Sequence, residues 1–574
     1  MSGAEAQATR QPKNGTLLLI LIQVASRALT FIGNQFLLRF LSPSLLGIAV
    51  QLELVSVTSL YFARESLRVA LQRQRPWSQS SKSISAGEGK WNVEGTETQT
   101  VVNLSHLAVL LGLVMSTIFG YSYLRSAPDE VLNSPYFNVS FQIYAAATLV
   151  ELFAEPAFVV IQQKALYKDR ARAETSAAMA RCLSACIVAV LGHQRGLAPS
   201  ILPFAAGQAA YALTLLALYS LPTIKLSKAE NFSLVPKQIL PPSPQQIYYF
   251  RLFHKTIISL AATMYMQSVF KLLLTQGDAL VLSFLSSLED QGAFALASNY
   301  GGLLARLVFQ PVEESSRNTF GRLLTPSSSL SNTKAPTPSD SPKNKIRPNE
   351  DTNNTRLVLS YLSTTLHIYL LFSLPLLSLA PQILPFLIPY ILSPQWRTPS
   401  TSLLLSTYCY YIPLMAVNGI LDAFVTSVAT PAQLRSQSLW MLVFTGLYGV
   451  AAWAMLKVWV MGSVGLVGAN MVNMALRILW SVAFLKTWVT MQAHRQADDG
   501  SKSNSGRKRR WGSKEMMMLN DAMPARASIA VAVLVNLGLR MSGSFTTSDA
   551  GKGGLDVQFL AFWITGVILL GSTM

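Results

Sequence analysis

The chain has few charges and very few cysteines, and each shortage excludes a class of protein. Charged residues make up 13% of its 574 residues, whereas hydrophobic residues make up 51%. A soluble domain has about twice that share of charged residues, so the sequence predicts an all-α polytopic membrane protein. The three cysteines, Cys182, Cys186 and Cys409, form neither a disulfide framework nor a zinc pattern. We therefore expect no metal site and no cofactor.

The sequence also lacks the motifs of catalysis and of ATP use. None of the five histidines stands in an HExxH pattern, and no P-loop, HRD or GxSxG segment is present. We therefore expect that the protein is not an enzyme, and that any transport is driven by ion or substrate gradients or is equilibrative. The net charge of +18 is interpreted as basic loops beside anionic lipid headgroups, not as a nucleic-acid surface.

Long apolar runs are what the sequence has in abundance. Most of the fourteen runs reach the ~20 residues that a membrane-spanning helix needs. With a cytosolic N-terminus, the cytosolic segments carry 34 of the 46 lysines and arginines, as the positive-inside rule requires, so we expect both termini in the cytosol. The two longest runs, 256–285 and 357–392, are expected to be interrupted or bent. The fourteen runs are 16–38, 45–62, 101–123, 137–160, 175–191, 198–220, 256–285, 292–312, 357–392, 401–428, 436–459, 462–486, 525–541 and 555–573.

Composition shifts along the chain predict its organisation. Two six-helix bundles around a central cavity are expected, followed by two C-terminal helices. A Pro-rich linker separates the bundles, and the second bundle contains a disordered cytosolic loop at 323–355. The predicted parts are an N-terminal bundle at 1–220, a cytosolic linker at 221–255, a C-terminal bundle at 256–490, a basic cytosolic loop at 491–524 and two additional helices at 525–574.

A repeat relates the two predicted bundles. A shift of 244 residues places Gln23 on Gln267, Arg27 on Lys271 and the triplet at 40–42 on the identical triplet at 284–286. Charges on membrane helices are rare and usually face a pathway. A duplicated cation therefore suggests two halves that face one cavity, as in transporters with parallel repeats.

Polar stripes on the first helix of each half predict the residues of that cavity. Spacings of three and four residues place each stripe on one helix face, although such residues can also simply hold helices together. Cations outnumber acids in the predicted spans, and this excess favours an anionic headgroup. The candidate substrate-binding residues are Gln23, Arg27, Asn34, Lys271, Asp278 and Arg306.

Further charged residues are candidates for gating or coupling. Glu151 and Glu155 share one helix face; they could bind a proton or a sodium ion, or they could neutralise nearby arginines such as Arg27. Two clusters at helix ends mix acids with arginines, which fits either salt bridges that close a cytosolic gate or ordinary anchoring. The clusters are Arg64, Glu65 and Arg68 in the first half and Glu313, Glu314 and Arg317 in the second.

Several segments resemble a known family. They are GTLLLILIQVASRALTFIGNQFLLRFLSPSLLGIAVQLELVSVTSLYFARESLRVALQRQ at 15–74, ELFAEPAFVVIQQ at 151–163, QGDALVLSF at 276–284, NYGGLLARLVFQPVEESSR at 299–317 and NGILDAF at 418–424. These stretches are similar to the Rft family of endoplasmic-reticulum glycolipid translocation proteins. The resemblance implies the fold of multidrug-and-toxin-extrusion carriers and lipid II flippases, with two six-helix bundles around a V-shaped cavity.

The resemblance also implies a substrate and a location. The substrate would be dolichol diphosphate carrying two N-acetylglucosamines and five mannoses, moved from the cytosolic to the lumenal leaflet of the endoplasmic-reticulum membrane for protein N-glycosylation. Membrane lipids and N-glycan assembly enzymes are the other expected partners. One alternative is a non-transporting glycolipid-binding or scaffold protein in the same pathway. Another is an organic-cation antiporter of the same fold, whose cavity should be acidic.

Overall fold

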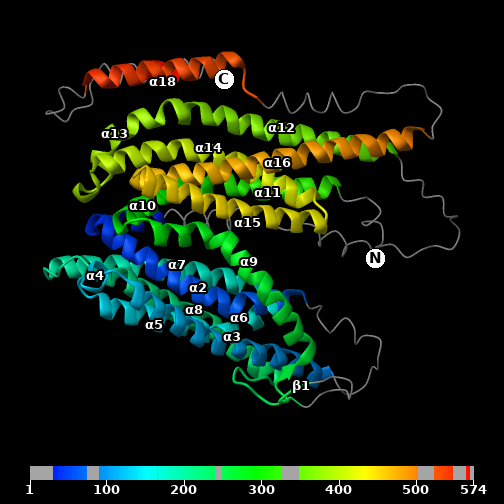
Figure 1. Ribbon diagram of the computed structural model, residues 1–574. Coiled ribbons are helices and arrows are strands. Elements are labelled where there is room, and N and C mark those ends of the chain that lie inside the picture. The colour runs from blue at the N-terminus through cyan, green and yellow to red at the C-terminus, as the bar shows by residue number, and fades with distance from the viewer. Residues whose placement is uncertain are drawn as a thin grey trace, which may run out of the picture. The chain divides into compact units, whose positions relative to one another are not determined.

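The computed structural model describes residues 30–73, 90–164, 166–239, 248–324, 348–501, 523–546 and 564–568. Helices account for nearly all of these residues, and most of the helices are long (Figure 1). The first predicted span, 16–38, is described only from residue 30, and the last, 555–573, only over 564–568. Most of both predicted spans therefore lies outside the described residues.

The chain divides into two compact units, and the first, Met1–Ala295, contains the candidate site. Its two short strands pair as an antiparallel hairpin, with Tyr248 opposite His254. The elements of this unit are a helix at 30–37, η1 (Leu38–Phe40), α2 (Pro43–Arg73), α3 (Lys90–Ser126), α4 (Asp129–Leu132), α5 (Phe137–Phe153), α6 (Glu155–Gln163), α7 (Tyr167–Gln194), α8 (Leu202–Glu230), β1 (Tyr248–Tyr249), β2 (Phe253–His254), α9 (Lys255–Leu285) and the beginning of α10 (Leu288–Leu304).

The second unit, Leu296–Met574, begins within α10. Helix α10 continues through a π-helical turn into α11, and α15 ends in a second π-helical turn. The elements after α10 are η4 (Ala305–Phe309), α11 (Gln310–Leu324), α12 (Pro348–Ser378), α13 (Ala380–Ile391), η6 (Pro394–Trp396), α14 (Pro399–Val428), α15 (Pro431–Trp453), η7 (Ala454–Val458), α16 (Gly462–Ser501) and α18 (Arg526–Thr546).

The helical, polytopic class predicted from the sequence is confirmed. Within the described residues, nine helical segments are long and apolar enough to cross a membrane, and α13 and α18 provide shorter apolar helices. The predicted apolar runs from 45–62 to 525–541 all fall on helices. The full count of fourteen spans stays a prediction.

Prolines explain where two of the long runs break. The run 137–160 is divided at Ala154 between α5 and α6, because Pro156 lacks the N–H that would continue the helix. The run 357–392 is divided at Leu379, just before Pro381. By contrast, α9 covers the run 256–285 without interruption.

The predicted linker 221–255 begins as a continuation of helix α8. Helix α8 continues to Glu230 and ends at Asn231, whose left-handed φ of 59° is a common helix C-terminus. The first ten residues of that segment are therefore helical. Helix α9, assigned to the second bundle by the sequence, packs along α2 within the first unit.

The beginnings of α2 and α10 cross with their backbones in contact. A Cβ atom added to Gly47 would overlap the carbonyl oxygen of Leu288, and one added to Gly292 would overlap that of Pro43. The side-chain amide Nε2 of Gln51 also donates to Oε1 of Gln291 at 3.0 Å. Only glycine allows two helices to approach this closely.

Candidate functional site

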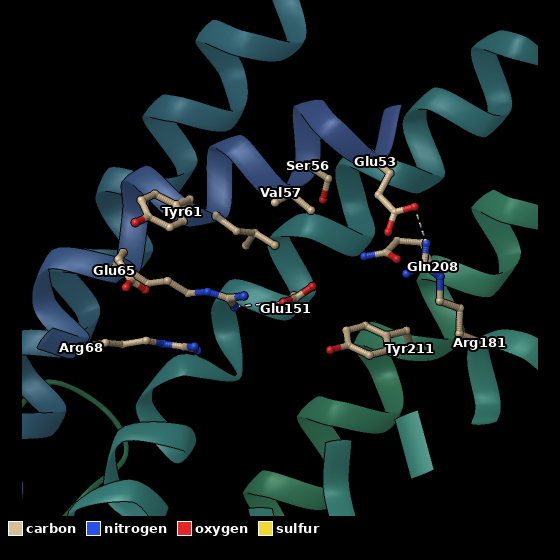
Figure 2. A pocket seen from close by; sticks show the side chains of 12 residues that line it. Glu53, Ser56, Val57, Tyr61, Glu65, Arg68, Glu151, Arg181, Gln208 and Tyr211 are labelled. Atoms are coloured by element: carbon tan, nitrogen blue, oxygen red, sulfur yellow. Dashed lines mark ion pairs between the residues drawn. The ribbon is translucent and has the colours of Figure 1, made fainter. Parts of the chain in front are cut away.

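A stripe of side chains along α2 lines one wall of a cavity in the first unit. Its members recur every three or four residues, which places them on one face of the helix. The cavity has a volume of about 320 Å³, at the small end of the roughly 300–1,000 Å³ typical of ligand pockets. The lining residues are Glu53, Ser56, Val57, Leu60, Tyr61, Arg64, Glu65 and Arg68 of α2, Glu151 of α5, Arg181 of α7, and Gln208 and Tyr211 of α8 (Figure 2).

Two arginines of the stripe pair with two buried carboxylates from neighbouring helices. Nη1 of Arg64 lies 2.9 Å from Oε1 of Glu151 and 3.9 Å from Oε2 of Glu155. Arg68 holds Glu155 in a bidentate pair, with Nε to Oε1 and Nη2 to Oε2 both 2.6 Å. The Glu155 side chain is only 2% exposed. A buried carboxylate is costly without a cation beside it, so these four side chains depend on one another.

A third arginine forms an ion pair with a glutamate at the N-terminal end of the α2 stripe. Nη2 of Arg181 lies 3.0 Å from Oε2 of Glu53, and Figure 2 shows the two side chains pointing toward each other. The lining therefore contains three arginines and three glutamates. The pocket is formally neutral, in contrast to the cation excess counted over the predicted spans.

Two polar atoms of the lining have no hydrogen-bond partner in the described part of the chain. They are the hydroxyl of Tyr61 and Oε1 of Gln208, whose side chains both border the pocket. Gln208 is only 6% exposed. Buried polar atoms are destabilising unless something bonds to them, so the pocket is suited to a ligand with hydroxyl groups.

The structure brings five of the predicted gating residues into this one region. Arg64, Glu65, Arg68 and Glu151 line the pocket, and Glu155 bonds to Arg68 just beside it. The sequence had treated the acid pair and the arginine cluster as separate features. Here both carboxylates neutralise arginines of α2.

Most of the predicted substrate-binding residues lie where the structure gives no side chain. Gln23 and Arg27 are outside the described residues, as are the side chains of Lys271, Asp278 and Arg306 on α9 and η4. Asn34 is exposed on the helix at 30–37. The backbone of Arg306 lies in the π-helical turn η4, a feature that often marks functional positions.

The second predicted gating cluster lies on α11 in the second unit. The carboxylate of Glu313 rests against Gly419 of α14, where any larger side chain would overlap it. Glu314 and Arg317 are exposed, and the backbone carbonyl of Arg317 accepts a 3.3 Å hydrogen bond from the hydroxyl of Ser427. Pairing between this cluster and the residues at 64–68 stays a prediction.

The sequence interpretation missed eight of the twelve residues that line the pocket. The residues not proposed as site residues include Glu53, Tyr61, Arg181, Gln208 and Tyr211. Those on α2 carried a detectable signal, because the three-and-four spacing runs unbroken from residue 53 to 68. Arg181, Gln208 and Tyr211 come from other helices and carried no comparable local pattern.

Comparison with known proteins places the chain in a family. The model of the Rft protein family matches residues 12–547. The chain belongs to the Rft family. This confirms the resemblance carried by the segments quoted above, including 151–163 and 299–317.

Curated Rft relatives cover most of the chain. A Yarrowia lipolytica protein named Man(5)GlcNAc(2)-PP-dolichol translocation protein is 34% identical, over 82% of this chain and 69% of its own length. A Saccharomyces cerevisiae protein of the same name is 31% identical, over 83% of each chain. Both similarities extend well beyond the candidate pocket.

The Rft chain also shares its fold with a solved flippase. The structure of lipid II flippase MurJ in an inward closed conformation superposes with a TM-score of 0.56. The match covers 97% of this chain and 98% of the other, at 11% sequence identity. At that identity the likeness shows the fold alone.

Proposed function

We propose that this Rft chain flips dolichol-diphosphate-linked oligosaccharide, with two N-acetylglucosamines and five mannoses, from the cytosolic to the lumenal leaflet of the endoplasmic-reticulum membrane. One observation carries the proposal: proteins named for translocation of this lipid are up to 34% identical over four-fifths of the chain. The MurJ-like fold and an ion-paired pocket in a membrane protein agree with it. Both termini face the cytosol in this arrangement.

The proposed architecture follows the sequence repeat. Fourteen spans form two six-helix bundles, 1–220 and 256–490, around a central cavity and joined by the linker 221–255. The basic loop 491–524 and two further helices at 525–574 follow the second bundle. The cations of this cavity are Arg27, Lys271 and Arg306, and the clusters at 64–68 and 313–317 close its cytosolic side.

The pocket supplies the chemistry that a diphosphate headgroup requires. An unpaired anion in the membrane core costs several kcal/mol or more, and arginine binds phosphate oxygens in a bidentate manner. Because Arg64 and Arg181 already hold carboxylates, the diphosphate replaces a glutamate on one of them, and the released carboxyl group takes up a proton so that no unpaired charge stays buried. Tyr61 and Gln208 then bond to sugar hydroxyls. The polyisoprenoid tail stays in the lipid.

The test is a flipping assay with the purified full chain in vesicles. Labelled dolichol-diphosphate oligosaccharide is incorporated, and a mannose-binding lectin outside the vesicles reports the fraction exposed on the outer leaflet. We expect the chain to make nearly the whole pool accessible with time, whereas protein-free vesicles expose only the outer leaflet's share. No gain over protein-free vesicles would contradict the proposal.

A charge-neutral double variant tests the role of the pocket. Arg64→Gln with Glu151→Gln removes one pocket ion pair and should slow flipping strongly. The control is Lys164→Gln with Glu230→Gln, a 2.8 Å ion pair of similar exposure outside the pocket lining, which should leave flipping unchanged. Underglycosylation in cells lacking the chain, combined with no flipping in vesicles, would instead favour the scaffold alternative.

A further inference from the structure

The chain between α8 and α9 ends in a hairpin, and hydrogen bonds from Gln99 and Asn103 of α3 hold this segment. Asn103, which is fully buried, donates through Nδ2 to the carbonyls of Lys237 at 2.7 Å and Leu252 at 3.1 Å. Its Oδ1 accepts from the backbone N–H of Lys237 at 3.0 Å. One turn earlier, Gln99 bonds to the backbone at Ser233 and Val235. The segment is therefore held in one orientation.

The hairpin turn has an unfavourable backbone. The N–H of Leu252 donates to the carbonyl of Tyr249 at 3.0 Å, and the two residues between them, Phe250 and Arg251, have φ of 53° and 55°. Positive φ at both central positions is the pattern of a type I′ turn, which strongly prefers Asn-Gly. A bulky aromatic and an arginine here cost folding free energy, and such strain persists where it serves a function.

The strained turn exposes an aromatic ring. Phe250 is 86% exposed, the highest value among the large hydrophobic side chains of the described residues. Tyr249 beside it is 44% exposed, and Val235 in the irregular segment after α8 is 67% exposed. Phe253, by contrast, packs inward against Leu67 and its neighbours. The hairpin thus anchors one aromatic side chain and projects another outward.

The same tip has charge of one sign only. Lys237, Arg251 and Lys255 are all exposed. The segment 231–255 contains no aspartate or glutamate. An apolar tip beside several cations, in a segment that has no acidic residue of its own, has the composition of a surface that binds anionic membrane lipid.

The hairpin tip lies near the ends of three helices that are candidate or predicted membrane spans. Gln99 and Asn103 stand at the beginning of the candidate span Thr98–Ser126, and the hairpin follows the span Leu202–Glu230. Helix α9 starts directly after it, at Lys255, and Figure 1 shows β1 beside the beginning of α9. A hairpin fixed to span ends is positioned at the boundary between lipid and water, where aromatic residues concentrate.

We propose that this hairpin tip is a lipid-binding site, with Phe250 inserted among the headgroups and Lys237, Arg251 and Lys255 bound to anionic phospholipid of the same leaflet. The positive-inside pattern makes this the cytosolic leaflet. The site requires only that the chain lies in a membrane, and it is independent of which substrate the chain moves.

The experiment places photoreactive p-benzoylphenylalanine at position 250 of the full chain. Vesicles contain phosphatidylcholine alone or phosphatidylcholine mixed with phosphatidylserine, and the adducts are identified by mass spectrometry after irradiation. We expect lipid adducts, with phosphatidylserine captured above its share of the mixture. Replacing Arg251 and Lys255 with glutamine should abolish that excess.

A matched control uses Tyr136, which is also exposed and also has a positive φ, of 58°. The preceding helix α4 carries the exposed acids Asp129 and Glu130, so the photoreactive residue at position 136 should show no preference for phosphatidylserine. An equal preference at both positions would overturn the proposal. Cross-links only within the chain, or to a second copy of it, would also overturn it.

A second variant separates lipid binding from folding. Phe250→Asn with Arg251→Gly installs the preferred turn pair, so the unfolding temperature in neutral detergent should be unchanged or higher. Added phosphatidylserine should raise the unfolding temperature of the unmodified chain clearly more than that of this variant, which keeps Lys237, Lys255 and the other basic loops. A full phosphatidylserine effect in the variant would refute the site.

Discussion

The bidentate pair between Arg68 and Glu155 leads to an asymmetric prediction. Glu155 is 2% exposed, whereas Arg68 is 21% exposed and lies 3.8 Å above the ring of Phe158. Replacing Arg68 with methionine leaves a buried carboxylate whose remaining cation, Arg64, is 3.9 Å away. Replacing Glu155 with glutamine leaves Arg68 with a neutral acceptor and some access to solvent.

The two single variants should lose different amounts of folding stability. Removing one partner and leaving the other buried as a charge costs about 3–5 kcal/mol, the value expected for Arg68→Met. Losing a hydrogen bond to a charged group costs roughly 1.5–3 kcal/mol, the value expected for Glu155→Gln. The double variant buries no unpaired charge. We therefore expect it to be more stable than Arg68→Met alone, although it contains one more substitution.

The assay is the free energy of unfolding of the full chain in bicelles, measured by steric trapping for the unmodified protein, both single variants and the double variant. The coupling energy follows from the cycle. Equal costs for the two single variants, or a double variant whose cost is their sum, would refute the view that Glu155 is a buried charge dependent on Arg68.

Two further predictions concern other parts of the chain. Gly292→Ala should lower the unfolding temperature in detergent, because the added Cβ overlaps Pro43 at the helix crossing and overpacking costs about 1–3 kcal/mol. At Gly446 an added Cβ meets nothing within 4 Å, so Gly446→Ala should raise the unfolding temperature through the higher helix propensity of alanine. An equal change in the unfolding temperature of the two variants would contradict the close crossing of α2 and α10. Arg27→Gln should cause the five-mannose lipid to accumulate in cells that carry only this variant, whereas Arg27→Lys should retain part of the function. Normal glycosylation with Arg27→Gln would make that cation structural.

Apolar runs predicted the helices but not their ends. The run 198–220 located α8, yet the helix continues through Lys225 and Lys228 to Glu230. Hydropathy detects only the membrane-buried part, whereas lysine, leucine and glutamate are good helix formers that extend a helix into water. Similarly, α2 continues past the run 45–62 to Arg73.

Partners across helices could not be predicted in the same way. Arg68 and Glu155 are 87 residues apart in sequence, and no local spacing connects them. The sequence did predict that Glu151 and Glu155 share a face and need either an ion or an arginine. Which arginine each contacts depends on how α2 packs against α5 and α6, and that packing is set by many small side chains at once.

The charge balance of the pocket differs from that of the predicted spans. Cations outnumber acids over the spans, whereas the lining has three arginines and three glutamates, of which Arg64, Glu65 and Arg68 lie beyond the predicted run 45–62. Desolvation makes an unpaired charge expensive, so arginines that face the interior recruit carboxylates. A transport site must also bind weakly enough to release its cargo. An excess of arginine would hold a diphosphate, whereas Glu53 and Glu151 can take back Arg181 and Arg64 as the headgroup leaves. A neutral pocket is therefore better suited to passage than a positive one.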